Sequence, residues 1–553
     1  MASVPPPPDV VPPDVVLHPG DAASEPSATT SHRDRLLTTL LGRRRIALGV
    51  SAHDRLWGWL GPLIVALVAA ALRLWNLGRP GTLVFDETYY VKQAYTLLRV
   101  GYEADWPDEP NPAFEAGDVD TYLAEADYVV HPQVGKWMIA AGMRLFGGAE
   151  NPWSWRIASA LVGALAVFLL ARIARRMFAS TAMGIVAGAL LAVDGAAIVH
   201  SRTGLLDNFL MFWVLVAFGC LLLDRDQARR RLAERCAAIL DAGGVVGRYG
   251  PRLGWRWWRL AAAVALGLAC GVKWSGLYFF AVFAVMSVVW DALARRAVGV
   301  TRWWEDALLV DAIPAALVML PTAALTYVAG WFSWFRTPGS YMREWAAENP
   351  TLGVTWLPES LRSLWEYHTR MWSFHTGLTS EHPYEAHPVG WLVQWRPTSF
   401  YYRSFAEGEG TCEIERCSRA ITSVGNPVLW WLAAAAVVVA LVLLVRLRDW
   451  RAGAALSGIL AGWAPWFLHS ERTIFTFYSI AFTPWVVLTL VYVATVALER
   501  TERLPVARGR AQWVIIMMLS VIGTVSVFFY PVWTAIEVPY WFWHLHMWLP
   551  SWV

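Results

Sequence analysis

The sequence predicts an all-helical protein that crosses a membrane about eleven times. Hydrophobic residues make up 56% of its 553 residues, and the mean hydropathy is +0.39, which is too apolar for an ordinary soluble domain. The apolar residues form stretches of about 20, the length that a helix needs to cross a bilayer. Arginine-rich segments separate these stretches in a regular alternation. The formal net charge of only +3 provides no field that would attract nucleic acid.

The apolar stretches set the positions of the spans. The run from Leu260 to Trp290 is divided at Lys273–Gly276, because one helix of ~30 residues would be about 45 Å long and would bury a lysine. We therefore expect membrane-spanning helices near residues 57–76, 155–172, 181–199, 206–223, 259–273, 275–291, 307–332, 427–445, 453–469, 474–497 and 512–530.

The basic residues predict the orientation. Cytoplasmic loops are enriched in lysine and arginine, and every second connection of this chain is basic. With the N-terminus inside, the inside segments are 172–176, 225–259, 295–302, 446–451 and 500–510. The first large outside segment is strongly acidic. An odd number of spans then leaves the N-terminus inside and the C-terminus outside.

This topology divides the chain into six parts. The first is a tail rich in proline and poor in apolar clusters, which we expect to be disordered. The parts are a cytoplasmic tail at 1–31, a basic juxtamembrane segment at 32–56, an N-terminal transmembrane module at 57–332 with its large outer loop 77–154, a second large outer loop at 333–426, C-terminal transmembrane helices at 427–530, and an outer aromatic tail at 531–553.

Two of the five cysteines lie together in the second outer loop. Cys412 and Cys417 can form a short-loop disulfide in an oxidising compartment. The alternative is a metal site, for which a second ligand pair is missing nearby. Cys220, Cys236 and Cys270 fall in spans or on the inside and are expected to be inert thiols.

Two adjacent carboxylates follow the first span by about ten residues. Asp86 and Glu87, in Phe85-Asp86-Glu87-Thr88-Tyr89-Tyr90, lie where the chain should meet the outer interface. Charges at this depth are unfavourable unless they are solvated or functional. The pair is either the start of an acidic loop or a catalytic site within reach of a lipid-borne group.

Cations gather on the same side of the membrane. Arginines are disfavoured on the outer side of a membrane unless they have a function there. The planar guanidinium group of arginine can donate two hydrogen bonds to a phosphate, so binding a lipid phosphate is one such function. Each of these residues can instead extend to the lipid headgroups. The residues are Arg73, Arg156, Arg202, Lys273 and Arg472.

Three further motifs are less specific. The segment His131–Lys136 contains a Pro-Gly turn before a short amphipathic stretch. Arg202 and Asp207 share one short outer turn, where they either form an ion pair or contact substrate. Asp224-Arg225-Asp226 and Asp118-Val119-Asp120 match an acid-x-acid metal pattern, but the first is on the cytoplasmic side and the second lies in a generally acidic stretch.

Taken together, these motifs resemble those of the protein O-mannosyltransferases, particularly the actinobacterial members. No single motif is specific, but their order and topological placement are. The resemblance is carried by Phe85–Glu87, His131–Lys136, Ser201-Arg202 with Leu206-Asp207, Gly271–Gly276, His387-Pro388 to Arg396-Pro397, and Arg472 through Pro484, which includes Tyr478.

The resemblance implies a glycosyltransferase of the GT-C class. Such enzymes move mannose from a polyprenyl phosphate to serine or threonine hydroxyls, with inversion. Asp86 matches the proposed base and Glu87 its partner. The candidates for binding the lipid phosphate or sugar are Arg73, His131, Lys136, Arg156, Arg202, Asp207, Lys273, Arg472 and Tyr478. Eukaryotic members carry a large soluble MIR domain in the second outer loop, for which residues 333–426 are too few.

The implied partners are the donor lipid, membrane lipids and flexible Ser/Thr-rich secretory polypeptides, with coupling to the secretion translocon as an extrapolation from the family. The implied location is the plasma membrane, with the active site on the extracytoplasmic side. Because the phosphate–sugar bond is already activated, we expect no obligatory metal cofactor. Two alternatives stay open: a GT-C transferase with another sugar or acceptor, and a transporter, against which the charges lie at the outer edge rather than at midplane.

Overall fold

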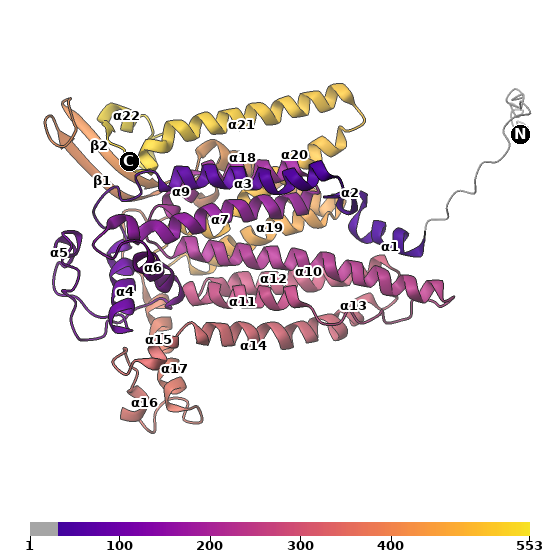
Figure 1. Ribbon diagram of the computed structural model, residues 1–553, viewed down its shortest axis with the longest axis horizontal. Helices are drawn as coiled ribbons and strands as arrows, with labels where there is room; N and C mark the ends of the chain where they lie inside the picture. The colour runs from indigo at the N-terminus through magenta and orange to yellow at the C-terminus, as the bar shows by residue number, and fades with distance from the viewer. Residues whose placement is uncertain (1–30) are drawn as a thin grey trace, which may run out of the picture.

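The computed structural model describes residues 31–553. The predicted disordered tail, residues 1–31, lies outside this range except for Ser31. The protein is a bundle of long helices that run side by side, with smaller elements gathered at one end (Figure 1).

Eight helical segments among the described residues are long and apolar enough to cross a membrane. Each coincides with a predicted span. They are α3 (Ala52–Leu74), α7 (Pro152–Phe178), α10 (Asp207–Asp241), α12 (Gly276–Ala297), α13, η1 and α14 (Trp303–Ala329), α18 (Pro427–Leu447), η4 and α20 (Thr476–Arg500) and α21 (Pro505–Trp533).

The other three predicted spans are helical but shorter or bent. They are α8 (Thr181–Val193) with α9 (Gly195–Ser201), α11 (Trp257–Val272), and α19 (Trp450–Trp463) continued by η3 (Ala464–His469). The bend between α8 and α9 is 63°. Asp194 lies at this bend and caps α9, because its Oδ2 accepts a hydrogen bond from the Ala197 amide at 3.0 Å.

The first outer loop folds into three short helices. They are α4 (Glu87–Val100), α5 (Asn111–Glu115) and α6 (Val134–Leu145). All three lie at the same end of the bundle in Figure 1. This loop therefore forms a cap over the outer ends of the spans rather than an extended acidic segment.

The second outer loop and the C-terminal segment complete this cap. Its elements are α15 (Phe332–Arg336), α16 (Trp345–Glu348), α17 (Glu359–Gly377), η2 (Pro388–Val393), β1 (Thr398–Ala406), β2 (Arg416–Ser423), β3 (Val538–Pro539), α22 (Tyr540–His544) and η5 (Pro550–Trp552). The strands form an antiparallel sheet in the order β1-β2-β3. This sheet was not predicted, and it is the one addition to the helical fold within residues 31–553.

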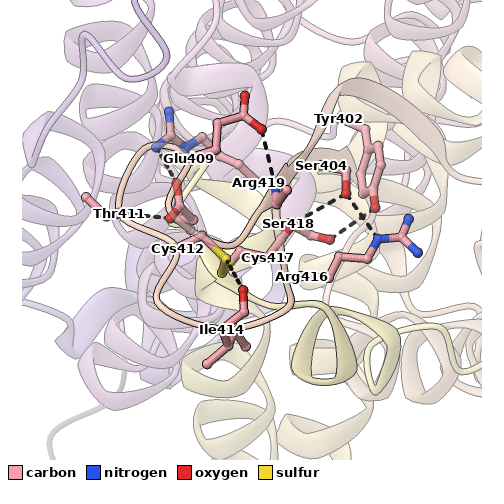
Figure 2. Close-up of a disulfide and its surroundings, with 12 residues drawn as sticks. Tyr402, Ser404, Glu409, Thr411, Cys412, Ile414, Arg416, Cys417, Ser418 and Arg419 are labelled. Atoms are coloured by element: carbon pink, nitrogen blue, oxygen red, sulfur yellow. Dashed lines mark hydrogen bonds and ion pairs between the residues drawn. A yellow bond between two sulfur atoms is a disulfide. The ribbon is translucent and has the colours of Figure 1, made fainter.

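Cys412 and Cys417 form a disulfide at the tip of the β1–β2 hairpin (Figure 2). The two thiols are used in this bond, which excludes the alternative that they bind a metal. Glu537 ties the tip to the C-terminal segment, because it accepts hydrogen bonds from Thr411 at 2.7 Å and from Arg419 at 2.8 Å.

The opposite end of the bundle carries α1 (His32–Leu41), α2 (Arg43–Ala47) and most of the arginine-rich connections. Its carboxylates are paired with arginines. Arg256 Nη2 lies 2.5 Å from Asp224 Oδ2, and Arg45 Nη2 lies 2.6 Å from Asp226 Oδ2. The acid-x-acid pattern at Asp224 and Asp226 is therefore part of an ion-pair network that joins the inner helix ends.

Candidate active site

The two adjacent carboxylates of the first outer loop have different surroundings. Asp86 is the residue before α4, and its side chain makes no capping hydrogen bond. Before it, Phe85 adopts a positive φ of 49°, and its ring stacks on Phe400 with centroids 4.6 Å apart. This contact with the start of β1 anchors the turn that holds Asp86.

Glu87 is fully buried, and its carboxylate oxygens accept four hydrogen bonds from the protein. Arg156 donates to it twice, from Nε to Oε1 at 2.8 Å and from Nη2 to Oε2 at 2.7 Å. The Val84 amide also donates to Oε2 at 3.0 Å, and the Gly204 amide to Oε1 at 2.7 Å. A carboxylate with this many donors is held in place, so Glu87 orients the turn.

Asp86 has the properties expected of a general base. It is partly exposed, whereas Glu87 is buried. Burial raises the pKa of the Asp86 carboxyl to about 6, with the Asp207 carboxylate adding to the rise and Lys273 and the Tyr90 hydroxyl opposing it. At pH 7 the group is therefore mostly ionised, but it is a stronger base than an ordinary aspartate.

Lys273 brings a positive charge close to Asp86. It lies in the turn between α11 and α12, where its Nζ is 2.8 Å from Asp207 Oδ2. The turn is tight, because a Cβ added at Gly276 would lie 2.8 Å from the backbone of Ala269. Asp207 thus pairs with Lys273, and the alternative pairing of Asp207 with Arg202 is replaced.

A cavity of about 260 Å³ opens beside this pair. Five of the predicted site residues line it: His131, Asp207, Lys273, Arg472 and Tyr478. Its remaining walls are mostly apolar or aromatic, from the turn between α11 and α12, the ends of α12, α17 and α19, and from η3 and η4. They include Trp274, Leu277, Phe279, Trp372, Ala461, Trp466 and Ala481. This combination of cations and apolar walls fits a phosphate that carries a hydrocarbon chain.

Arg472 is the cation of this cavity with an unused donor. Its Nη2 lies 3.2 Å from His375 Nδ1, and its Nε is buried without a hydrogen-bond partner within residues 31–553. Such a donor is unfavourable unless an acceptor fills the site. An oxygen of a bound phosphate would satisfy it.

Two neutral histidines lie beside Arg472. His375 Nε2 is 2.8 Å from the Val130 carbonyl oxygen, and its ring stacks on His131 with centroids 5.2 Å apart. Burial, with Arg472 next, lowers the pKa of His375 to about 4. Burial and the nearby Lys273 also hold the pKa of His131 well below its usual value. Both rings are therefore uncharged at pH 7 and can contact a sugar as well as a phosphate.

Four residues predicted to bind the lipid phosphate or sugar make hydrogen bonds inside the protein. Arg73 donates to the Ala192 carbonyl at 3.0 Å and to Ser201 Oγ at 3.1 Å. Arg202 donates to the carbonyls of Arg73 at 2.8 Å and Trp75 at 2.7 Å, and so closes the C-terminal end of α3. Lys136 pairs with Glu103 at 2.9 Å. Arg156 holds Glu87, as described above.

These four residues do not line the cavity, and their donors are engaged within the protein. Their assignment as ligands of the lipid phosphate or sugar stays a prediction. The structure also adds residues that the sequence interpretation missed, namely Tyr278, His375 and His469. His368 and His375 are seven residues apart on α17, so they lie on one face of this helix. That spacing is the sequence feature that could have indicated His375 as a site residue.

Comparison with known proteins identifies the family. The family model "Dolichyl-phosphate-mannose-protein mannosyltransferase" matches residues 63–329, and the model "C-terminal four TMM region of protein-O-mannosyltransferase" matches residues 360–552. A polyprenol-phosphate-mannose–protein mannosyltransferase of Mycolicibacterium smegmatis is 37% identical over 90% of this chain and 94% of its own. The chain belongs to the protein O-mannosyltransferase family. The Mycobacterium tuberculosis protein of the same name is 36% identical over 90% of this chain and 92% of its own.

The fold of this protein O-mannosyltransferase agrees with that assignment. The structure of the Saccharomyces cerevisiae protein O-mannosyltransferase Pmt1–Pmt2 complex, bound to the sugar donor, matches with a TM-score of 0.69 at 15% identity. The match covers 92% of this chain and 94% of the yeast chain. At this identity the likeness establishes the fold, and it is the GT-C fold that the motifs implied.

Proposed function

We propose that this protein O-mannosyltransferase transfers mannose from polyprenyl-phosphate-mannose to serine and threonine hydroxyls of secretory polypeptides, with inversion at the anomeric carbon. The observation that carries the proposal is that Asp86, a half-buried carboxylate, interacts electrostatically with Lys273 and Asp207, and these two residues line a cavity together with Arg472 and apolar walls. A base, a phosphate site and a place for a lipid chain are the three parts that the reaction needs.

Asp86 is the general base. As the acceptor oxygen forms its bond to the anomeric carbon, the hydroxyl proton passes to the Asp86 carboxylate. The bond between that carbon and the phosphate oxygen breaks at the same time, and its electron pair leaves with the phosphate. Glu87 and Arg156 act as positioning residues, because their buried pair fixes the turn that carries Asp86.

Arg472 and Lys273 stabilise the leaving phosphate. Charge develops on the phosphate oxygens as the glycosyl bond breaks, and cations already in place stabilise that charge without reorganisation. Arg472 offers the unused Nε–H, while Lys273 is held in position by Asp207. These side chains supply the charge that a divalent metal would otherwise provide, so the reaction proceeds without an obligatory metal.

The reaction takes place on the extracytoplasmic side of the plasma membrane. Two observations support this side. The basic segments around α1 and α2 lie at the end of the bundle opposite α4, the helix that Asp86 precedes, as cytoplasmic segments do (Figure 1). The hairpin β1–β2, which carries the disulfide Cys412–Cys417, lies at the same end as α4. The acceptor would then be a flexible polypeptide emerging from the secretion machinery.

The test is transfer of labelled mannose from polyprenyl-phosphate-mannose to a Thr-rich peptide by the protein in lipid nanodiscs. We expect Asp86→Asn to lose nearly all transfer and Asp108→Asn, an exposed residue of the same loop, to keep it. A full rate in Asp86→Asn would overturn the base assignment. Parallel reactions with other polyprenyl-phosphate sugars separate this function from that of a GT-C transferase with another donor.

A further inference from the structure

A second polar cavity lies at the end of the bundle opposite Asp86. Its volume is about 630 Å³. Six arginines and three carboxylates line it, an excess of three positive charges. They are Arg43, Arg44, Arg45, Arg176, Arg225 and Arg451, with Asp226, Asp449 and Glu499. The proposed reaction uses none of these residues.

The carboxylates of this cavity are already neutralised. Asp226 Oδ2 lies 2.6 Å from both Arg45 Nη2 and Arg176 Nη1. Arg451 Nη2 lies 2.9 Å from Asp449 Oδ2 and 2.8 Å from Glu499 Oε2. Arg44 also pairs with Glu499 at 3.0 Å and with Glu502, and Arg225 lies 3.4 Å from Asp226. The acids thus hold the arginines in place, while the arginines that line the cavity still outnumber its acids.

Arg225 carries a buried donor that residues 31–553 leave unpaired. Arg225 is only 5% exposed, and its guanidinium lies 3.4 Å from the centroid of the Trp450 ring. Its Nε is buried and has no hydrogen-bond partner in the described part of the chain. A buried arginine donor that lines a positively charged cavity calls for an anionic acceptor.

An apolar groove adjoins this cavity. Its volume is about 790 Å³, and it shares Arg44, Phe178, Ala179 and Glu499 with the charged cavity. Its walls come from the end of α7, from the first turns of α8, and from α20 and α21, and its polar members include Glu502, Arg508 and Gln512. Its apolar members include Met183, Val186, Ile515, Ile516 and Leu519. The groove therefore leads from the arginines along the membrane-spanning part of two helices.

We propose that the charged cavity and the groove together bind one anionic phospholipid of the inner leaflet. The arginines contact the headgroup phosphate, which suits the planar donor fork of arginine, and one acyl chain lies between α8 and α21. A basic pocket between helices on the cytoplasmic side is a recurrent way to hold such headgroups. The apolar groove distinguishes this occupant from a free phosphate ion, which would leave the groove empty.

The test measures lipid retention by native mass spectrometry of the full chain, purified in detergent with added phosphatidylglycerol or phosphatidylcholine. We expect one phosphatidylglycerol to remain bound under conditions that remove phosphatidylcholine. Arg225→Gln should weaken retention about fivefold, and the exposed pair Arg43→Gln with Arg44→Gln should weaken it at least as much. The exposed pair keeps the test valid if Arg225→Gln does not fold. Val186→Trp should also weaken retention by filling the groove.

Arg503→Gln is the matched control, because Arg503 is an exposed arginine of the same end and lines neither cavity. Retention should be unchanged in that variant. Equal retention of phosphatidylcholine, or native retention in the arginine variants, would overturn the proposal. Displacement of phosphatidylglycerol by millimolar inorganic phosphate, with Val186→Trp unchanged, would instead identify a site for free anions and would also overturn it.

Discussion

Arg156 and Glu87 are joined by two hydrogen bonds of 2.8 and 2.7 Å, and both side chains are fully buried. Glu87 directly follows Asp86, so this pair determines where the Asp86 carboxylate can be. Two adjacent acids in one motif therefore have separate tasks, one in the scaffold and one in the reaction.

The first prediction concerns the stability of this scaffold. Glu87→Gln leaves the Arg156 guanidinium buried without its counter-charge, which should lower the free energy of unfolding by ~3–5 kcal/mol. Thermal unfolding of the purified protein in detergent measures this. Glu109→Gln, an exposed acid of the same loop, is the control. A Glu87→Gln protein that unfolds at the native temperature but has lost transfer would show that Glu87 acts in the reaction itself.

The second prediction concerns the pH dependence of transfer. Because burial raises the pKa of Asp86 to about 6, the carboxyl is protonated below that pH and cannot accept the hydroxyl proton. The rate constant kcat/KM should therefore rise about tenfold per pH unit below pH 6 and level off above it. Initial rates in nanodiscs between pH 5 and 8 test this, with protein stability checked at each pH. A flat profile over this range would be inconsistent with Asp86 as the base.

The third prediction concerns the phosphate site. Arg472→Gln removes the unused donor beside His375 and should reduce kcat/KM by about 10²-fold, as the loss of a donor to a developing negative charge does. Arg472→Lys should restore part of the rate, because it keeps the charge but not the fork. Arg370→Gln, an exposed arginine of α17, is the control. If Arg472→Gln binds and uses the donor normally, the phosphate lies elsewhere.

The fold follows from the sequence pattern more directly than the contacts of individual side chains do. Each of the eleven apolar stretches is helical. A membrane span must be about 20 residues long and mostly apolar, so its sequence signal extends over many residues and does not depend on any one of them. The bend at Asp194 depends on partners far along the chain, such as the Asn426 amide at 3.0 Å, so local pattern could not show it. The sequence of the second outer loop has no clear alternation of apolar and polar residues at β1 and β2, so local pattern did not predict this sheet.

The arginines show why sequence alone does not give the contacts of a candidate site residue. Membrane depth identified Arg73, Arg156, Arg202 and Arg472 as unusual, and all four are at the outer end of the bundle. Depth alone does not tell whether carbonyls of the protein already accept an arginine's hydrogen bonds. Arg202 contacts four carbonyls near the end of α3, whereas Arg472 keeps a donor unused. Only the folded structure separates these two cases.

The last prediction concerns the disulfide. Cys412 and Cys417 are five residues apart, so their bond restrains a short loop, and its loss should cost about 2 kcal/mol by the chain-entropy model. The effect should stay local, because Glu537 still holds the tip through Arg419 and Thr411. Replacing both cysteines by serine should therefore speed amide hydrogen exchange in residues 407–415 while leaving the rest of the hairpin protected.

Transfer by the double serine variant should proceed at the native rate, since the hairpin tip does not line the cavity beside Lys273. Hydrogen exchange followed by mass spectrometry and the mannose transfer assay, run on the same preparation, separate the two effects. Loss of transfer in a variant whose exchange differs only at the tip would mean that the hairpin guides the acceptor polypeptide toward Asp86. Its disulfide would then serve the reaction as well as the fold.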